Sequence, residues 1–265
     1  MRHICKITIF YFLAFIIDFK NTQNITVMFY DGYCTKVHKG NLDKGKVKNP
    51  FHINNLAQGV GLYDGSRLSN LKESLKVQNL WRNMLQRCYD SKFHERQPTY
   101  IDVTVCERWL TYSNFEKDIA EMENYKMFIE NGWELDKDLL LIGNKEYSKD
   151  CCSFLPRALN SKFSKISSIF EGDTGTTVLP YGGYRVNVSG IRGKKSHIGC
   201  YKTKEEALNV YRKYKCEILL QSLQEYVSVI DQNVVTSVTN YIESYRKQQS
   251  KIGRASCRER VSSPV

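Results

Sequence analysis

The periodicity of the sequence changes within residues 184–218, and this change constrains the fold more than any other feature. Apolar and polar side chains alternate over residues 184–189, which is typical of a strand with one buried face. A glycine-rich turn leads into a second strand-like stretch at 194–201. Thr203 and Glu206 then form a capping box, which predicts the start of a helix. We therefore expect a three-stranded antiparallel sheet packed on one helix.

The two faces of this sheet are expected to differ in chemistry. The helix should cover one face with an apolar stripe formed by Ala207, Val210, Tyr211, Tyr214 and Ile218. If Ile198 points to the helix, Ser196 joins it there. Alternation sends the following side chains to the opposite face: Arg185, Asn187, Ser189, Lys195 and His197. Strands fit the major groove, where Arg, Asn and Lys address base edges or phosphates, so this face is predicted to bind double-stranded DNA.

Basic residues are concentrated in the same part of the chain. The 265 residues contain 39 Lys and Arg against 28 Asp and Glu, a formal charge of +11. Residues 157–216 alone contain 12 Lys and Arg and 4 Asp and Glu. Such an excess indicates a polyanionic partner, of which nucleic acid is the commonest. Charge by itself leaves open a surface that is basic only for solubility.

Both ends of the chain differ from the part between them. Residues 1–27 contain an eleven-residue apolar run, 7–17, which is too short to span a bilayer and resembles a signal-peptide core or translated upstream sequence. We expect an internal start at Met28 and hence an intracellular protein, in the cytoplasm and nucleoid or the nucleus. Residues 252–265 resemble the translation of a sequencing adapter. Without both ends the charge is +7, from 33 Lys and Arg and 26 Asp and Glu.

The remaining chain divides into five expected segments, and its fold class is predicted to be α+β. They are an irregular arm at 28–76, a small mixed α+β block at 77–168, a linker at 169–183, the sheet-plus-helix module at 184–224 and a C-terminal helix at 225–251. The last helix could pack on the module or dimerise, so the oligomeric state stays open. The globular part is not expected to enter a membrane.

The module resembles a known DNA-binding domain. The matching residues are Tyr184-Arg185, Lys194, His197 to Tyr201, Thr203, Glu205 to Ala207 and Tyr211. They are similar to the APETALA-type domain of plant ethylene-response factors, in the version carried by bacteriophage and mobile-element proteins. The resemblance covers about forty residues and implies that the sheet docks in the major groove. Lys194 thereby joins the five side chains above as an expected contact, whereas His197 replaces a tryptophan of the plant members, so their sequence preference does not carry over.

The central block resembles phage proteins related to HNH endonucleases. The matching residues are Trp81 to Tyr89, Val105 to Trp109, Asn114-Phe115, Leu135 to Asp138, Gly143-Asn144, Tyr147-Ser148, Cys152 and Asn160. Such nucleases use a histidine as general base and a metal ion that holds the scissile phosphate. The resemblance makes Asp136 and Asn160 metal ligands and Asn144 the orienting asparagine. Lys137 occupies the position of the base; it is protonated at neutral pH and suits a phosphate clamp better.

Three hypotheses about function remain open. The first is a DNA-binding protein with a degenerate HNH-like block. The second is an active, homing-like DNA endonuclease that depends on a metal, with Mg²⁺ the expected cofactor in that case alone. The third is a structural or interaction protein without a nucleic-acid role, which predicts no salt-dependent affinity for DNA. At Asp136 and Asp138, a solvated turn with caps and surface ion pairs is the alternative to a metal site.

Overall fold

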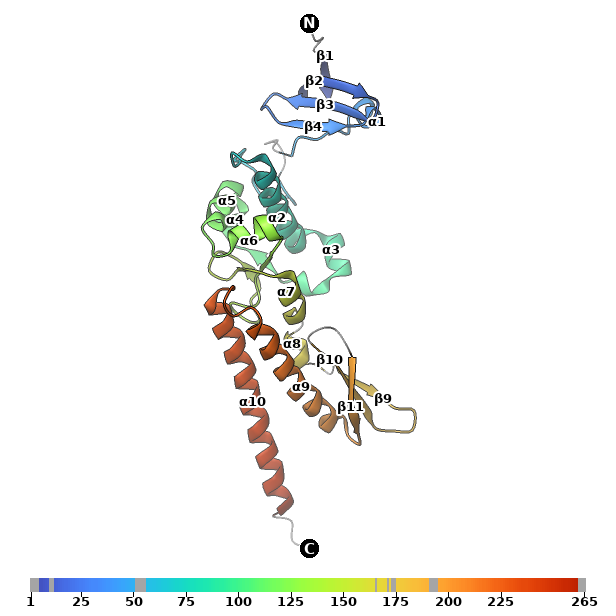
Figure 1. Ribbon diagram of the computed structural model, residues 1–265, viewed down its shortest axis with the longest axis vertical. Coiled ribbons are helices and arrows are strands. Elements are labelled where there is room, and N and C mark those ends of the chain that lie inside the picture. The colour runs from blue at the N-terminus through green and yellow to red at the C-terminus, as the bar shows by residue number, and fades with distance from the viewer. Residues whose placement is uncertain are drawn as a thin grey trace.

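The computed structural model describes residues 5–9, 12–50, 56–164, 166–170, 172, 175–190 and 195–261, with side chains from 14 to 247 within these ranges. Figure 1 shows an elongated arrangement with an N-terminal sheet, a mixed central block, and a second sheet beside two long helices. The predicted α+β class is confirmed. A small mixed block is followed by a three-stranded antiparallel sheet packed on one helix.

The N-terminal sheet has four antiparallel strands in sequential order: β1 (Cys5–Ile9), β2 (Phe12–Asn21), β3 (Asn24–Phe29) and β4 (Cys34–Val37), followed by the short helix α1 (Lys39–Asp43). Ala14, Ile25 and Val27 are buried in its small core with Phe29 and Val47. The expected leader at 1–27 and irregular arm from 28 do not match this fold, because Met28 lies inside β3. The alternation that defines β3 runs through residue 28 without a break.

The central block packs short elements around the long helix α2 (Leu71–Tyr89). The others, in order, are α3 (Ser91–Arg96), η1 (Pro98–Tyr100), β5 (Thr104–Val105), α4 (Glu107–Leu110), α5 (Tyr112–Ala120), α6 (Tyr125–Asn131), β6 (Glu134–Asp136), β7 (Glu146–Tyr147), β8 (Ser153–Leu155), α7 (Arg157–Phe163) and α8 (Ile166–Phe170). β5 pairs in parallel with β7, and β6 pairs antiparallel with β8.

Helix α2 buries the stripe expected from its sequence, but it begins earlier than expected. Val77, Trp81 and Leu85 are fully buried in the central core, as the spacing predicts. The helix starts at residue 71 instead of 77, because the Asn70 side chain accepts hydrogen bonds from the backbone N–H groups of residues 72 and 73. The N-terminal boundary of the central block therefore moves to 71.

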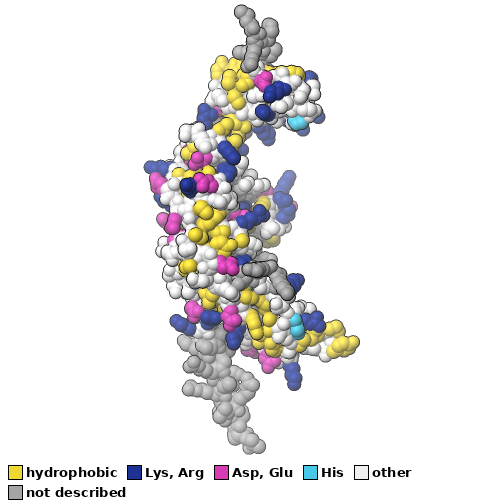
Figure 2. Space-filling model, viewed as in Figure 1, with side chains coloured by type: hydrophobic (Ala, Val, Ile, Leu, Met, Phe, Trp, Pro, Cys, Tyr) yellow, Lys and Arg dark blue, Asp and Glu magenta, His cyan; other side chains and the backbone are white. Residues whose placement is uncertain are grey.

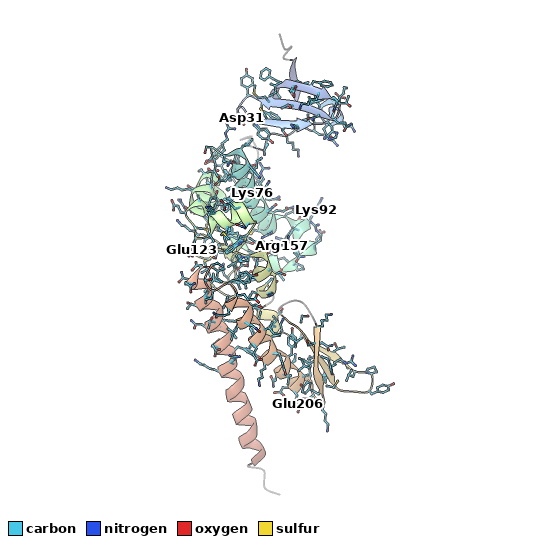
Figure 3. All side chains as sticks on the ribbon, viewed as in Figure 1. Asp31, Lys76, Lys92, Glu123, Arg157 and Glu206 are labelled. Atoms are coloured by element: carbon cyan, nitrogen blue, oxygen red, sulfur yellow. The ribbon has the colours of Figure 1, made fainter. Side chains whose placement is uncertain are left out.

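The C-terminal part consists of β9 (Thr176–Val178), β10 (Tyr184–Ser189), β11 (Lys195–Tyr201), α9 (Lys204–Gln224) and α10 (Gln232–Val261). The sheet order is β11-β10-β9, so the third strand comes from the segment expected to be a linker. That expectation is wrong, since residues 169–183 also contain the end of α8. The Thr203–Glu206 capping box is present at the start of α9, where Figure 3 labels Glu206.

Helix α9 contributes to two cores. Ala207 is buried against Val186 and Val188 of β10, whereas Leu219 and Leu223 are buried in the central core. Tyr214, expected in the apolar stripe, is 41% exposed.

Helix α10 adds its own stripe, Val234, Val238 and Ile242, to the central core. The expected helix at 225–251 therefore starts later, runs further and packs on the central block. None of the helices, where the structure describes them, is long and apolar enough to cross a membrane.

The N-terminal sheet gives a first test of the fold. We expect Ile25→Ala to destabilise this sheet by about 2–5 kcal/mol, because it empties a fully buried site. Phe19→Ala, at a side chain that is 58% exposed, is the matched control and should change stability little. Amide hydrogen exchange over residues 14–37 measures both. Unchanged protection in Ile25→Ala would mean that the residues before Met28 are not part of the folded sheet.

Candidate nucleic-acid interface

The polar face of the C-terminal sheet is formed by side chains that lie opposite one another on β10 and β11. Asn187 pairs with His197 and Ser189 pairs with Lys195, so each pair projects to the same side. Arg185 extends the row on β10, and all five side chains are exposed. Val186 and Val188, between them on β10, are buried on the other side. The structure thus brings five of the six expected DNA contacts onto one open face, and Lys194 lies outside the described residues.

A β-bulge in β11 sets which side chains reach this face. Val186 pairs with Gly199 and the next residue, Asn187, pairs with His197, so Ile198 has no partner on β10. Ile198 packs, half-buried, against the core between the sheet and α9. Ser196 pairs with Val188 and therefore lies on the same side of the sheet as Ile198, as expected, although its side chain is exposed.

Two further residues of the polar face were not predicted. The bulge places Cys200 opposite Arg185, and β9 places Thr177 opposite the same arginine on its other side. Strict alternation in β11 would place Cys200 on the opposite face of the sheet. The expected linker at 169–183 would leave Thr177 outside the sheet altogether. Both are exposed and small, so they leave the guanidinium of Arg185 accessible.

The charged side chains described on this face are all positive. Its side chains include Arg185 and Lys195 and no carboxylate, and neither cation forms an ion pair within the described part of the chain. Figure 2 shows a histidine with Lys or Arg side chains beside it over this sheet. His197 Nδ1 lies 3.3 Å from Asn187 Oδ1, a hydrogen bond that orients both side chains. The sheet therefore offers two free cations on either side of an ordered polar pair.

The tip of the β9–β10 hairpin also projects into solvent. Tyr181 is fully exposed at the turn, and Val178 at the end of β9 is 69% exposed. Gly182 and Gly183 adopt left-handed backbone conformations there, with φ of +88° and +86°, which favour glycine. The hairpin tip thus presents an aromatic side chain next to the polar face.

The central block places Asp136 at the end of β6, where its side chain organises the backbone that follows. Its Oδ1 accepts hydrogen bonds of 2.9 Å from the backbone N–H groups of Asp138 and Leu139. Burial raises the pKa of Asp136 to about 6, and the neighbouring Asp138 carboxylate adds to the rise. This carboxyl group acts as a local cap in the structure.

The Lys137 ammonium points into the protein. It forms an ion pair with Asp138 and donates to the Asn144 carbonyl at 3.1 Å, while the Tyr147 ring lies 6.0 Å away. The side chain is 7% exposed, so the ammonium is turned away from solvent, and the expected role as a phosphate clamp or catalytic group stays a prediction.

Asn144 holds the same loop together. Its Nδ2 donates to the Lys137 carbonyl at 2.9 Å and to the Glu146 carbonyl at 2.5 Å, and its Oδ1 accepts from the Glu146 N–H at 3.1 Å. The expected orienting asparagine is thus bonded entirely to loop backbone.

Asn160 lies on α7 and bonds to Glu134 at the other end of β6. Its Nδ2 donates to Glu134 Oε2 at 3.0 Å, and Arg157 Nε lies 3.5 Å from Glu134 Oε1, on the helix end labelled in Figure 3. In the described residues no three His, Cys, Asp or Glu side chains lie close enough to hold a metal ion. The side chains expected as metal ligands, Asp136 and Asn160, therefore do not fit a Mg²⁺ site.

Comparison with family models, curated proteins and solved structures finds no match to this chain. The sites described above therefore depend on their own geometry and chemistry.

The raised pKa of Asp136 predicts a pH dependence of stability. The folded protein binds this proton more tightly than the unfolded chain, so the contribution of Asp136 is fully present below about pH 4 and is lost as the pH rises through about 6. Asp136→Asn keeps the accepting oxygen and removes the charge. We expect it to stabilise the protein at pH 7 by roughly 1–3 kcal/mol.

Chemical denaturation of both proteins between pH 4 and 7 measures this effect. The difference between variant and wild type should grow across that range. A difference that stays constant with pH would show that Asp136 ionises in the folded protein as it does in the unfolded chain.

Proposed function

We propose that this protein binds double-stranded DNA by placing the polar face of β10 and β11 in the major groove. The observation that carries the proposal is the set of five exposed polar side chains on one face, which carries no carboxylate among the residues that the structure describes: Arg185, Asn187, Ser189, Lys195 and His197. Phosphate contacts require cations, and base edges require donors and acceptors at fixed positions. This face offers both.

The dimensions of the sheet suit the groove. Neighbouring strands lie about 4.8 Å apart, and the major groove of B-DNA is about 12 Å wide, enough for a two-stranded ribbon. β9 adds a third strand of only three residues, so the ribbon of β10 and β11 remains the main surface. The bulge at Ile198 increases the local twist of the ribbon, which helps it follow the groove.

The polar pair in the middle of the face supports base readout. Asn187 and His197 lie opposite each other and are hydrogen bonded, so their positions are ordered before binding. Arg185 and Lys195 lie toward the two ends of the row, where contacts to phosphates or to guanine are available. We assign specificity to the pair and most of the electrostatic affinity to the cations.

Single substitutions on the two sides of the module test the interface. We expect Arg185→Ala and Lys195→Ala each to weaken duplex binding by about 1–3 kcal/mol, and to make the salt dependence of log K shallower by about one for a phosphate contact. Lys213→Ala is the matched control, because Lys213 is exposed on α9, which covers the opposite face of the sheet. Fluorescence anisotropy with duplexes selected by the wild-type protein, at several salt concentrations, gives both quantities.

Equal effects of the three substitutions would place the interface elsewhere. Affinity that does not depend on salt would exclude phosphate contacts altogether.

An HNH-type nuclease is the second candidate, and one arrangement favours it. The antiparallel strands β6 and β8 are followed directly by α7, and Asn144 ties the loop between the strands. The buried ammonium of Lys137 and the pairing of Asn160 with Glu134 count against activity. We expect plasmid DNA to stay intact in Mg²⁺. Nicking that Asp136→Ala abolishes would instead support the nuclease.

A further inference from the structure

The N-terminal sheet carries a second concentration of positive charge. Residues 38–48, called the basic segment below, contain four Lys and one Asp. The central block, residues 71–168, contains 15 Lys and Arg and 15 Asp and Glu, so it is neutral as a whole. A surface that was basic only for solubility would not require this division, whereas a local excess of cations indicates a polyanionic partner at that place.

Most ammonium groups of the basic segment are free. Lys39 forms an ion pair with Asp43 at 2.8 Å across one turn of α1. The other three lysines are exposed and form no ion pair within the described part of the chain: Lys44, Lys46 and Lys48. Val47, between the last two, is buried in the core of the N-terminal sheet, which fixes the backbone that carries them. The segment therefore presents three free cations from an ordered backbone.

The surface beside Lys44 is hollowed. A hollow of about 460 Å³ lies between the β2–β3 turn and α1, and its lining includes the side chains of Thr22, Gln23 and Lys44. The turn is joined to α1 because the Lys39 N–H donates to the Thr22 carbonyl at 2.7 Å. Hydroxyl, amide and ammonium groups all donate to phosphate oxygens. Neutral donors thus lie next to the free cations.

Hydrogen bonds fix the N-terminal sheet on the central block. The Asp31 carbonyl, between β3 and β4, accepts from Arg67 Nη2 at 2.8 Å. The Pro50 carbonyl, two residues after the basic segment, accepts from Gln78 Nε2 at 2.6 Å and from Arg82 Nη2 at 2.8 Å, both on α2. The basic segment therefore has a defined position relative to α2.

The basic segment and the C-terminal sheet lie on the same side of the elongated molecule. In Figure 1, α1, α3 and the C-terminal sheet all lie on the right-hand side of the view. Figure 2, seen from the same direction, shows Lys or Arg side chains with a histidine over each of the two sheets. Double-stranded DNA is stiff over about 150 base pairs, so a duplex held by one sheet continues almost straight past the rest of the protein.

We propose that the basic segment holds the phosphate backbone of the duplex outside the site that the C-terminal sheet binds. The inference rests on the proposed function and extends it from one contact to two. Lysines hold phosphates as point charges, and phosphate contacts carry no sequence information, so this second contact is independent of the flanking sequence. It adds affinity because the first contact already keeps the flanking DNA close to the protein.

Duplex length tests the second contact. The short duplex contains only the site that the wild-type protein selects, and the long duplex adds random-sequence flanks several helical turns in length. We expect the full-length wild-type protein to bind the long duplex about three- to tenfold more tightly, with a steeper salt dependence and for any flanking sequence. Fluorescence anisotropy at several salt concentrations measures both quantities.

Substitution of the free lysines should remove this gain. Lys44→Gln/Lys46→Gln should bind the short duplex as the wild type does, lose most of the gain from the flanks, and show a salt dependence on the long duplex that is shallower by about two. Lys44→Arg/Lys46→Arg should retain the gain. The matched control is Lys117→Gln/Lys126→Gln, because both lysines are exposed and lie on α5 and α6, which Figure 1 shows on the side away from α3. It should change neither quantity.

A substitution at Asp43 should have the opposite effect. Asp43 is the one carboxylate in the sequence of the basic segment, and it neutralises Lys39. Asp43→Asn frees this ammonium group, so we expect affinity for the long duplex to rise about two- to threefold and affinity for the short duplex to stay the same. Weaker binding of the long duplex by Asp43→Asn would count against the contact.

The outcomes separate this inference from the proposed function. If the wild-type protein binds both duplexes equally well and Arg185→Ala weakens both, the C-terminal interface stands and the second contact is overturned. An equal loss of the gain in Lys44→Gln/Lys46→Gln and in its control would also overturn it, because total charge alone would then decide the affinity. If the wild-type protein binds neither duplex, the proposed function fails and this inference fails with it.

Discussion

The burial of α9 on two sides is the interaction on which the arrangement of this protein depends. The first half of the helix covers the apolar face of the sheet, where Ala207 meets Val186 and Val188. Its second half inserts Cys216, Leu219 and Leu223 into the core of the central block, beside the stripe of α10. Because one rigid helix enters both cores, the polar face of the sheet has a fixed direction relative to the central block. The three-residue strand β9 and the ribbon of β10 and β11 could not keep this direction by their own contacts.

Much of this part of the fold could be predicted from local patterns. Alternation over residues 184–189, the capping box at Thr203 and the stripe of α2 all rest on contacts between near neighbours in the chain, and the structure has each of them. Local patterns did not predict the elements that form by pairing with distant segments of the chain. Residues 176–178 become a strand because the edge of β10 is available to pair with them, and their own sequence has no alternation long enough to reveal this. The residues around Met28 were misassigned because the apolar run before them resembles a leader more than a strand.

The two candidate sites differ in how much of their geometry could be predicted from the sequence. On the sheet, side-chain direction follows from a period of two, so five polar side chains could be assigned to one face without knowledge of the rest of the molecule. In the central block the roles of Asp136, Lys137 and Asn160 were transferred by position in a motif. The position of a residue in a motif does not determine how the loop around it folds. In the structure, the Lys137 side chain points into the protein and Asn160 forms a hydrogen bond with Glu134.

The unpaired residue Ile198 decides which side chains of β11 stand beside Arg185. Deleting it would leave the other pairs as they are, because His197 and Gly199 already lie opposite the consecutive residues Asn187 and Val186. A strand that kept Ile198 but paired it with Val186 would instead turn every later side chain to the opposite side, so that Gly199 would lie opposite Arg185 and Tyr201 would leave the core beside α9. The extra residue thus keeps an aromatic ring in the core and leaves a small thiol at the surface, and a shift of the bulge along the strand would change the binding chemistry without a change in amino-acid composition.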